Sequence, residues 1–349
     1  MKYILLIFVI LYISSCQKRK EESIIPLNLH ESSNDIKYSQ LIKSLDYITL
    51  NLGDTCLLSG IQKIYFDNDT IIVQDKKREG IYIFTHNGKF IKQINYIGEG
   101  LAEYHNVNAI TVDTISNHIY IYDVINFKIN QYTYQGEFIK SDKVEYFMKD
   151  FAITVEGYNI MFQPYTSKTY KKNGVWICSS NNKFIKQLIE HKSNNQEFEF
   201  ISTLYNETFD GIYYYDRNND NIYLINADSA KLLYTINLKQ KSPEKVRNIS
   251  NLSPIELEGH SMMYDFCISS KHIIFTYFIF GENENPFRWV LLDRKRKTNI
   301  VVCKNLENDF DEMKSSNYKL FYLNDSTWCR VVDRHEKDCN TLLQIMHLK

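Results

Sequence analysis

An internal repeat limits what this chain can fold into more than any other feature of its sequence. One pattern of apolar stretches, an Asp at a strand end and a Gly-containing turn occurs twice without a gap, 48 residues apart. Asp75 corresponds to Asp123, and Gly88 corresponds to Gly136. The first copy covers residues 71–75, 81–84 and 87–92; the second covers 119–123, 129–132 and 135–140; weaker copies lie at 176–186 and 212–233.

One repeat has the pattern of a small antiparallel sheet. Short stretches of β-forming residues are separated by polar turns, and Asn87-Gly88 is a pair favoured in tight hairpins. A unit of about 45 residues matches one four-stranded blade of a β-propeller. Because a single blade cannot bury both of its faces, several blades must pack around a common axis. The sequence therefore predicts an all-β propeller.

The length favours six blades. Six repeats of this period need roughly 270 residues, which fits residues 46–349, whereas eight would not fit and seven would need short final blades. An open ring would leave two exposed edges, so the strand-like residues 45–50 are predicted to pair with residues 342–346 and close the last blade. Residues 239–259 are predicted to be a loop between blades. The predicted blades are 61–94, 107–140, 146–190, 200–238, 260–303 and 316–348.

The first sixteen residues have the pattern of an export signal. Lys2 precedes an apolar run at residues 3–13, about half the length of a membrane-spanning helix. The sequence Ile13-Ser14-Ser15-Cys16 resembles the lipobox of bacterial lipoproteins, which implies that Cys16 is lipidated; ordinary signal cleavage beside a chance cysteine is the alternative. The predicted organisation is a signal peptide at 1–16, a solvated tether at 17–40 and a propeller at 41–349.

Composition limits the partners of the folded body. A formal net charge of −1 gives no basic footprint for nucleic acid, and no later segment is long and apolar enough to span a membrane. Six cysteines follow Cys16, without a CxxC pair. Two interpretations stay open for them: a disulfide between Cys329 and Cys339 across the last hairpin, or buried free thiols.

Two segments resemble a known family. Residues 41–50 and 61–69 are similar to the opening of six-bladed β-propeller lipoproteins of Bacteroidetes-type bacteria. Residues 98–104 are similar to the Gly-x-Gly-x-x-Glu-Tyr turn between blades in that family and in NHL-repeat propellers. The resemblance covers about residues 41–140. It implies six blades, closure by an N-terminal strand, and a lipid anchor in the outer membrane, on its periplasmic or its surface side.

No group of residues forms a catalytic signature. Residues 98–104 lack the third glycine and the following helix of a nucleotide-binding loop, so they are predicted to form a turn. Asp75, Asp123 and Asp216 recur at strand ends, where Asp usually accepts hydrogen bonds from nearby backbone amides. The alternative for these three residues is a ring of carboxylates at one mouth of the propeller channel, able to bind a cation.

Four histidines are candidate metal ligands because propeller lyases and lactonases related to NHL folds hold a central metal. No two of them have a ligand spacing, and we expect no metal and no cofactor. The histidines in question are His105, His118, His260 and His335. Asp265, Asp309, Asp311 and Glu312 are predicted to be solvated loop charges.

The expected function is that of an anchored binding or scaffold module. Its partner would be a peptide, a glycan or a protein held at one face of the propeller or at the channel mouth, where loops gather. The alternative is a metal-assisted hydrolase or lyase with its site in the central channel. Fold alone does not decide between them.

Overall fold

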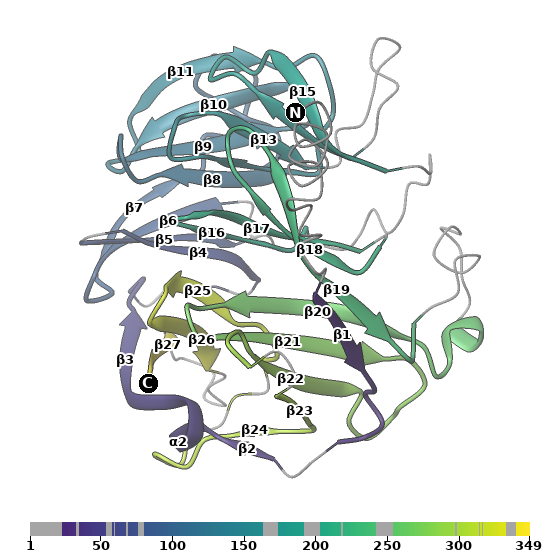
Figure 1. Cartoon of the computed structure of the whole chain (residues 1–349). Helices are drawn as coiled ribbons and strands as arrows, with labels where there is room; N and C mark the ends of the chain where they lie inside the picture. The colour runs from purple at the N-terminus through teal and green to yellow at the C-terminus, as the bar shows by residue number, and fades with distance from the viewer. Residues whose placement is uncertain are drawn as a thin grey trace, which may run out of the picture.

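The structure is a computed structural model in which six small antiparallel sheets form a ring (Figure 1). It describes residues 23–32, 35–53, 58, 60–67, 69–75, 80–162, 174–191, 203–217, 219–241, 254–296, 299–313, 315, 317–332 and 340–349. Each sheet has four strands of one blade, and β16 to β19 carry a fifth strand at their outer edge. The predicted six-bladed propeller is confirmed.

The blades follow the chain in order, from the innermost strand of each to the outermost. Blade 1 is β4 (Ile61–Asp67), β5 (Thr70–Asp75), β6 (Gly80–Thr85) and β7 (Phe90–Ile94); blade 2 is β8 (Ala109–Asp113), β9 (His118–Asp123), β10 (Lys128–Thr133) and β11 (Phe138–Lys143). Blade 3 is β12 (Asp150–Ile153), β13 (Asn159–Phe162), β14 (Gly174–Cys178) and β15 (Phe184–Glu190); blade 4 is β16 (Tyr205–Thr208), β17 (Gly211–Asp216), β18 (Asn221–Ile225) and β19 (Ala230–Leu238). Blade 5 is β20 (Ser261–Ile268), β21 (His272–Ile279), β22 (Phe287–Asp293) and β23 (Ile300–Cys303); blade 6 is β25 (Phe321–Asn324), β26 (Thr327–Val332), β27 (Thr341–Leu348) and β3 (Ile42–Leu50).

The hydrophobic core is divided among the six interfaces between neighbouring blades. Buried side chains form six clusters, and each cluster joins one blade to the next. Between blades 1 and 2, for example, Ile72 and Ile83 pack with Ile110 and Ile121. Alternate side chains of a strand point to opposite faces, so each blade supplies one face to each of its two neighbours. This arrangement is why the blades cannot be stable alone.

The ring is closed by a strand from the beginning of the chain. β3 pairs antiparallel with β27, with Thr49 opposite Leu342 and Leu45 opposite Met346. The predicted closure is therefore confirmed, in the predicted region of both strands. Leu50 then packs with side chains of blade 1 in the cluster that joins the last blade to the first. Closure pairs the last edge that an open blade 6 would expose.

The prediction of a tether over residues 17–40 is wrong from Ser23 onward. β1 (Ser23–Leu27) pairs in parallel with β19 as the fifth strand of blade 4, and β2 (Ile36–Lys37) pairs with β24 (Leu306–Glu307). Ile25 and Leu27 are buried in the core, so this segment is part of the folded body and not a solvated tether. The proline at position 26 is compatible with this strand because the strand lies at a sheet edge. Residues 17–22 lie outside the described part of the chain.

The remaining elements are short. A single helical turn, α2 (Tyr38–Leu41), leads into β3 and buries Tyr38 and Leu41. A 3-10 turn at Pro254–Leu257 lies within the loop predicted at 239–259. No helix in the described ranges combines the length and hydropathy needed to cross a bilayer.

The glycine of the repeat is required by the packing of one blade on the next. Gly88 and Gly136 have φ angles of +82° and +75°, in the left-handed region that favours glycine. A Cβ atom on Gly88 would lie 2.1 Å from the carbonyl oxygen of Thr49 in the preceding blade. A Cβ atom on Gly136 would lie 3.0 Å from Cγ of Lys92 in the preceding blade. The repeated turn is therefore both a hairpin and a contact between blades.

Candidate functional site

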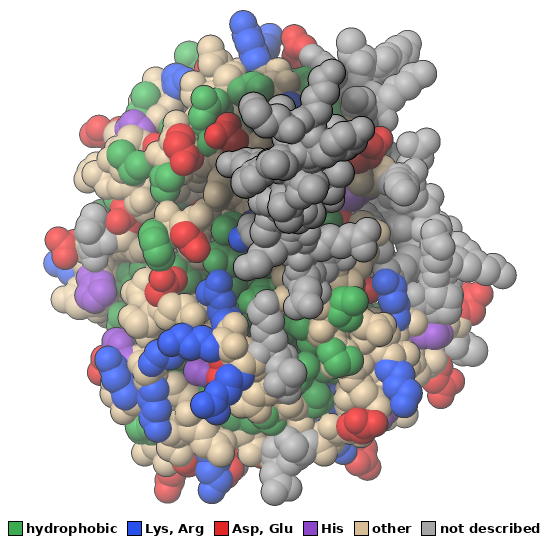
Figure 2. Space-filling view, in the orientation of Figure 1, with side chains coloured by type: hydrophobic (Ala, Val, Ile, Leu, Met, Phe, Trp, Pro, Cys, Tyr) green, Lys and Arg blue, Asp and Glu red, His purple; other side chains and the backbone are tan. Residues whose placement is uncertain are grey.

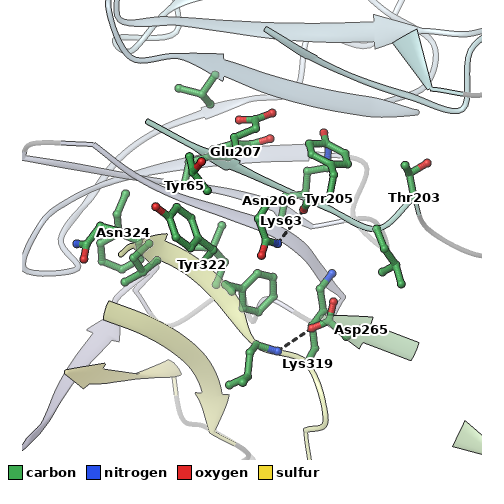
Figure 3. A pocket seen from close by; sticks show the side chains of 18 of the residues that line it. Lys63, Tyr65, Thr203, Tyr205, Asn206, Glu207, Asp265, Lys319, Tyr322 and Asn324 are labelled. Atoms are coloured by element: carbon green, nitrogen blue, oxygen red, sulfur yellow. Dashed lines mark hydrogen bonds between the residues drawn. The ribbon is translucent and has the colours of Figure 1, made fainter. Parts of the chain in front are cut away.

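The innermost strands of the blades surround a central cavity of about 810 Å³. All six blades contribute to its wall, and Figure 3 shows side chains from several of them converging on it. The first strand of each blade begins at one mouth of this channel, here called the entry mouth. It ends at the other, here called the hairpin mouth, where it turns into the second strand. One wall residue from each blade is Lys63, Val112, Asp150, Glu207, Asp265 and Lys319.

Lys63 is the centre of a hydrogen-bonded cluster inside the channel. Its Nζ lies 2.8 Å from Oδ1 of Asp150 and donates to the Tyr205 hydroxyl and, over 2.8 Å, to the carbonyl oxygen of Ile110. The Tyr205 hydroxyl in turn donates to the carbonyl oxygen of Phe151, 2.9 Å away. The Lys63 and Asp150 side chains are only 16% and 6% exposed, so their ion pair is largely shielded from solvent. All three donors of the ammonium group are used, and this cluster fixes blades 1 to 4 to one another.

Glu207 lies in the same region but has few partners. The Thr111 hydroxyl donates to its Oε1 over 2.9 Å. Burial raises the pKa of Glu207 from 4.5 to about 7, although nearby Lys63 opposes this shift. Burial also raises the pKa of Tyr65 well above its ordinary value. Glu207 is therefore a carboxyl group that a ligand with hydrogen-bond donors would stabilise.

A second polar group lies nearer the entry mouth. The backbone amide of Leu320 donates to Oδ2 of Asp265 over 2.9 Å, and burial raises the pKa of Asp265 to about 6. Lys319 donates to the carbonyl oxygen of Gln62, and its Nζ lies 4.9 Å from the centre of the Phe321 ring. Burial lowers the pKa of Lys319. Donors and acceptors thus face the channel from different blades (Figure 3).

Aromatic side chains line much of the rest of the cavity. The Tyr205 ring stacks with that of Phe162, 4.7 Å between centres, and Nζ of Lys63 lies 4.7 Å from the Tyr205 ring centre. Phe209 at the hairpin mouth and Tyr264 near the entry mouth are 76% and 43% exposed. Each ring presents a flat apolar face beside the cavity, on which a ligand can pack. Phe209 and Tyr264 are therefore candidate contact surfaces for a ligand.

The repeated aspartates do not form a carboxylate ring. Asp75, Asp123 and Asp216 are fully buried at the ends of second strands, and none lines the channel. Asp123 accepts hydrogen bonds from the backbone amides of His105 and Ile125 over 3.0 and 3.1 Å, which is the local bonding expected of such a residue. Asp216 lies 3.3 Å from Nε2 of His191, so its partner includes a neighbouring blade. The cation-binding alternative is wrong for these residues.

The candidate histidines are dispersed. His105 contacts Glu99 over 3.2 Å, and His118 contacts Gln131 over 2.6 Å. His260 donates its backbone amide to Leu257, and His335 lies outside the described residues. Across the described ranges no three His, Cys, Asp or Glu side chains gather as a metal site would require. Residues 98–104 form the predicted turn, in which Glu103 accepts the Gly100 amide over 2.7 Å.

The cysteines that the structure describes are buried thiols. Cys178, Cys267, Cys303 and Cys329 are free, and Cys329 lies opposite Ile345 in the last hairpin. This position favours the free-thiol interpretation over the disulfide for Cys329. Cys16, Cys56 and Cys339 lie outside the described residues. Lipidation of Cys16 therefore stays a prediction.

The prediction of solvated loop charges is wrong for Asp265. This residue is in β20 and is 6% exposed, because its side chain points into the channel wall. Asp309 and Asp311 are exposed, yet they accept hydrogen bonds from Ser39 and Tyr47 and so attach the N-terminal segment. Sequence reasoning missed Lys63, Asp150, Glu207 and Lys319 altogether.

The fold and its central cavity define a class: a single six-bladed β-propeller with a polar and aromatic channel. The chain belongs to the family described as Domain of unknown function (DUF4934), whose model matches residues 22–336. No curated protein matches the chain significantly.

Two solved structures support the fold. A putative exported protein from Bacteroides fragilis is 15% identical, has a TM-score of 0.76, and is matched over 94% of this chain and 100% of its own. A member of the DUF4221 family from Bacteroides vulgatus is 11% identical, has a TM-score of 0.53, and is matched over 88% of this chain and 97% of its own. At these identities the likeness establishes the propeller fold, and the resemblance to Bacteroidetes-type propellers is confirmed to that extent.

The visible surface carries charges of both signs. Figure 2 shows acidic and basic side chains interspersed over much of this view, with Lys and Arg gathered near β3 and the C-terminus. This mixture agrees with the formal net charge of −1. A propeller with a mixed surface and a central polar cavity fits a binding or scaffold module.

Proposed function

We propose that this protein is a lipid-anchored module of the cell envelope that binds a short glycan in its central channel. The observation that carries the proposal is the cavity itself, in which carboxyl, ammonium and aromatic groups from five of the six blades meet. Ligand pockets combine apolar and aromatic walls with a few converging polar groups. The cavity volume of about 810 Å³ lies within the usual range of such pockets.

A glycan fits the chemistry of this wall better than other polar ligands. Sugar hydroxyl groups can donate to Glu207 and Asp265, whose carboxyl groups burial leaves with raised pKa values. The C–H faces of a sugar ring can pack on exposed aromatic rings such as Tyr264. A lone ion would not use the aromatic rings. Lys63 and Asp150 already form an ion pair with each other, so neither offers an unpaired charge to such an ion.

A lipid anchor at Cys16 would hold the propeller close to its membrane. β1 begins at Ser23, so only residues 17–22 separate the lipidated cysteine from the folded body. The seven residue-to-residue steps from Cys16 to Ser23 span about 25 Å at most when fully extended. A chain this short keeps the channel near the membrane surface instead of releasing the propeller into solution.

Titration calorimetry tests the glycan site after a glycan-array screen has found a ligand. We expect Glu207→Gln and Tyr264→Ala each to weaken binding about tenfold, because each removes one hydrogen-bonding or stacking contact. Ile125→Ala is the control, since Ile125 is 58% exposed and lies outside the channel. Binding of peptides but no glycan, or equal affinity of all three variants, would overturn the proposal.

Membrane fractionation tests the anchor separately. We expect Cys16→Ala to move the protein from the membrane to the soluble fraction, because a lipidated cysteine supplies the acyl chains that hold it there. An unchanged membrane fraction would disprove anchoring at Cys16 while leaving the channel proposal intact. The metal-assisted alternative gains no support from the described residues, because their possible ligands do not gather.

A further inference from the structure

A second cavity of about 360 Å³ opens beside the hairpin mouth of the channel. Residues from blades 4, 5 and 6 form it, and three of them, Thr208, Phe209 and Asp325, also line the channel. The two cavities are therefore neighbours with a shared wall. We call the second one the side groove.

Phe209 stands at the junction of the two cavities. It occupies the turn between the first and second strands of blade 4 and is 76% exposed. The corresponding turn of blade 2 carries Ile115, which is 71% exposed but lines neither cavity. An aromatic ring at this junction gives a flat apolar surface on which a chain-like ligand can pack as it leaves the channel.

The side groove has a basic group that is held in place without a carboxylate partner. Arg294 donates to the Tyr213 hydroxyl over 2.9 Å and to the carbonyl oxygen of Ser269, and its guanidinium lies 5.3 Å from the centre of the Tyr213 ring. None of the ion pairs found among the described residues includes Arg294 or Lys295. Uncharged groups of Tyr213, Tyr234 and Ser269 thus orient the guanidinium, and no carboxylate contacts it directly among the described residues.

The acidic groups of the groove are already occupied. Asp210 accepts hydrogen bonds from the hydroxyl groups of Thr208 and Tyr213, and Asp325 accepts one from Tyr322 over 3.0 Å. Lys295 is exposed beside Arg294. The groove therefore places two positive charges beside two carboxylates whose oxygens already accept hydrogen bonds from hydroxyl groups. An anionic group suits such a surface.

We infer that the side groove is a subsite for the acidic part of an oligosaccharide whose other end occupies the channel. This inference rests on the glycan site proposed above and adds its ligand class, a chain of sugars with a carboxylate. The chain packs on Phe209 where it passes between the cavities, and its carboxylate binds at Arg294 and Lys295. A neutral or very short sugar uses the channel alone.

The test compares acidic and neutral oligosaccharides of matched length. An oligouronate hexasaccharide, an oligouronate disaccharide and a neutral glucan hexasaccharide are titrated into the full-length protein. We expect the acidic hexasaccharide to bind most tightly, with an affinity that falls as salt is added. Equal affinities for the acidic and neutral hexasaccharides would overturn the subsite.

Two variants and one control locate the contact. We expect Phe209→Ala and Lys295→Gln each to weaken binding of the acidic hexasaccharide about tenfold while leaving the disaccharide unaffected. Ile115→Ala is the matched control and leaves both affinities unchanged. Loss that is equal for Phe209→Ala and Ile115→Ala would disprove the contact at Phe209.

The outcomes also separate this inference from the glycan site itself. If no oligosaccharide binds, the proposed function fails and the subsite with it. If the oligosaccharides bind and Glu207→Gln weakens them all, but length and charge have no effect, only the subsite fails. A peptide that competes with the acidic hexasaccharide at the groove would replace the glycan as its ligand and overturn the inference.

Discussion

Blade 2 and blade 6 have the same four-stranded sheet, but the chain builds them in different ways. Blade 2 takes its strands from one continuous stretch, Ala109–Asp113 to Phe138–Lys143, so its pairings are between neighbours in sequence. Blade 6 takes three strands from the end of the chain and its outermost strand, β3, from near the beginning. Of these two blades, only blade 6 carries the cost in chain entropy of bringing distant segments together. The comparison shows that one blade of the ring joins its two ends.

Additional contacts strengthen the blade that joins the ends. Arg330 on β26 is buried and donates to the Tyr38 hydroxyl over 2.8 Å. Tyr38 in turn donates to Gln344 on β27 over 3.1 Å. These bonds tie the segment before β3 to the C-terminal strands. Blade 2 needs no equivalent, because its connections are short.

The largest expected effect comes from removing a buried tryptophan of blade 6. Trp328 is fully buried and donates its Nε1–H to the carbonyl oxygen of Ile268 over 3.1 Å. We expect Trp328→Ala to lower the free energy of unfolding by about 3–5 kcal/mol, measured by urea denaturation. Because Trp328 supports the closing blade, limited proteolysis should also cut the N-terminal segment faster.

Trp176 in blade 3 is the matched control for that variant. It is also almost fully buried, but its blade is continuous in sequence. Trp176→Ala should cost a similar free energy of unfolding while the N-terminal segment stays protected. Equal cleavage of this segment in both variants would contradict a special role for blade 6.

A smaller effect is expected from Tyr38→Phe, which removes one hydroxyl group between the N-terminal segment and blade 6. It leaves a donor of Arg330 without its acceptor, so we expect a loss of about 1–3 kcal/mol in urea denaturation. Tyr132→Phe is the counterpart in blade 2, where the hydroxyl donates to the carbonyl oxygen of Ala102 over 2.7 Å. Faster amide exchange in β3 should follow only from Tyr38→Phe; the same change in both variants would refute the comparison.

The smallest expected effect on stability comes from the channel, whose wall is built by blade 2, blade 6 and the other four blades together. Burial raises the pKa of Glu207 from 4.5 to about 7, so between these values the folded state binds a proton more tightly than the unfolded state. The free energy of unfolding should therefore fall as pH rises through this window. Glu207→Gln should flatten this fall, measured as urea midpoints at the two ends of the window. An unchanged pH profile would show that Glu207 is not titrating there.

The repeated pattern made the fold predictable from the sequence. The blade boundaries follow from the alternation of apolar stretches and turns, which is a local signal. Ring closure is a long-range pairing of residues 45–50 with the last hairpin, and it was predicted from the need to cover an open edge. β1 was missed because it is five residues long, contains a proline and pairs with a strand about two hundred residues away. No local sequence pattern predicts a pairing over this separation.

The site was less predictable than the fold. The contact of Lys63 with Asp150 and Tyr205 joins three strands that are far apart in sequence. A usable signal was present, however, in the first strand of each repeat. Lys63, Asp150, Glu207 and Asp265 each place a charge in or beside a strand that, as the innermost of its blade, must face the axis. Charged residues in such strands mark a channel wall, because solvent exposure cannot explain them.

The parallel pairing of β1 with β19 would have a mechanical consequence if the protein is anchored at Cys16, as proposed above. A pull on the N-terminal end of β1, directed against the course of the strand, would act along its pairing with β19. The hydrogen bonds along Ser23–Leu27 and Tyr234–Leu238 are then loaded together in shear, instead of opening one after another. Drag on the propeller would be borne first by the outer edge of blade 4, and the strands around the channel would be shielded from the force.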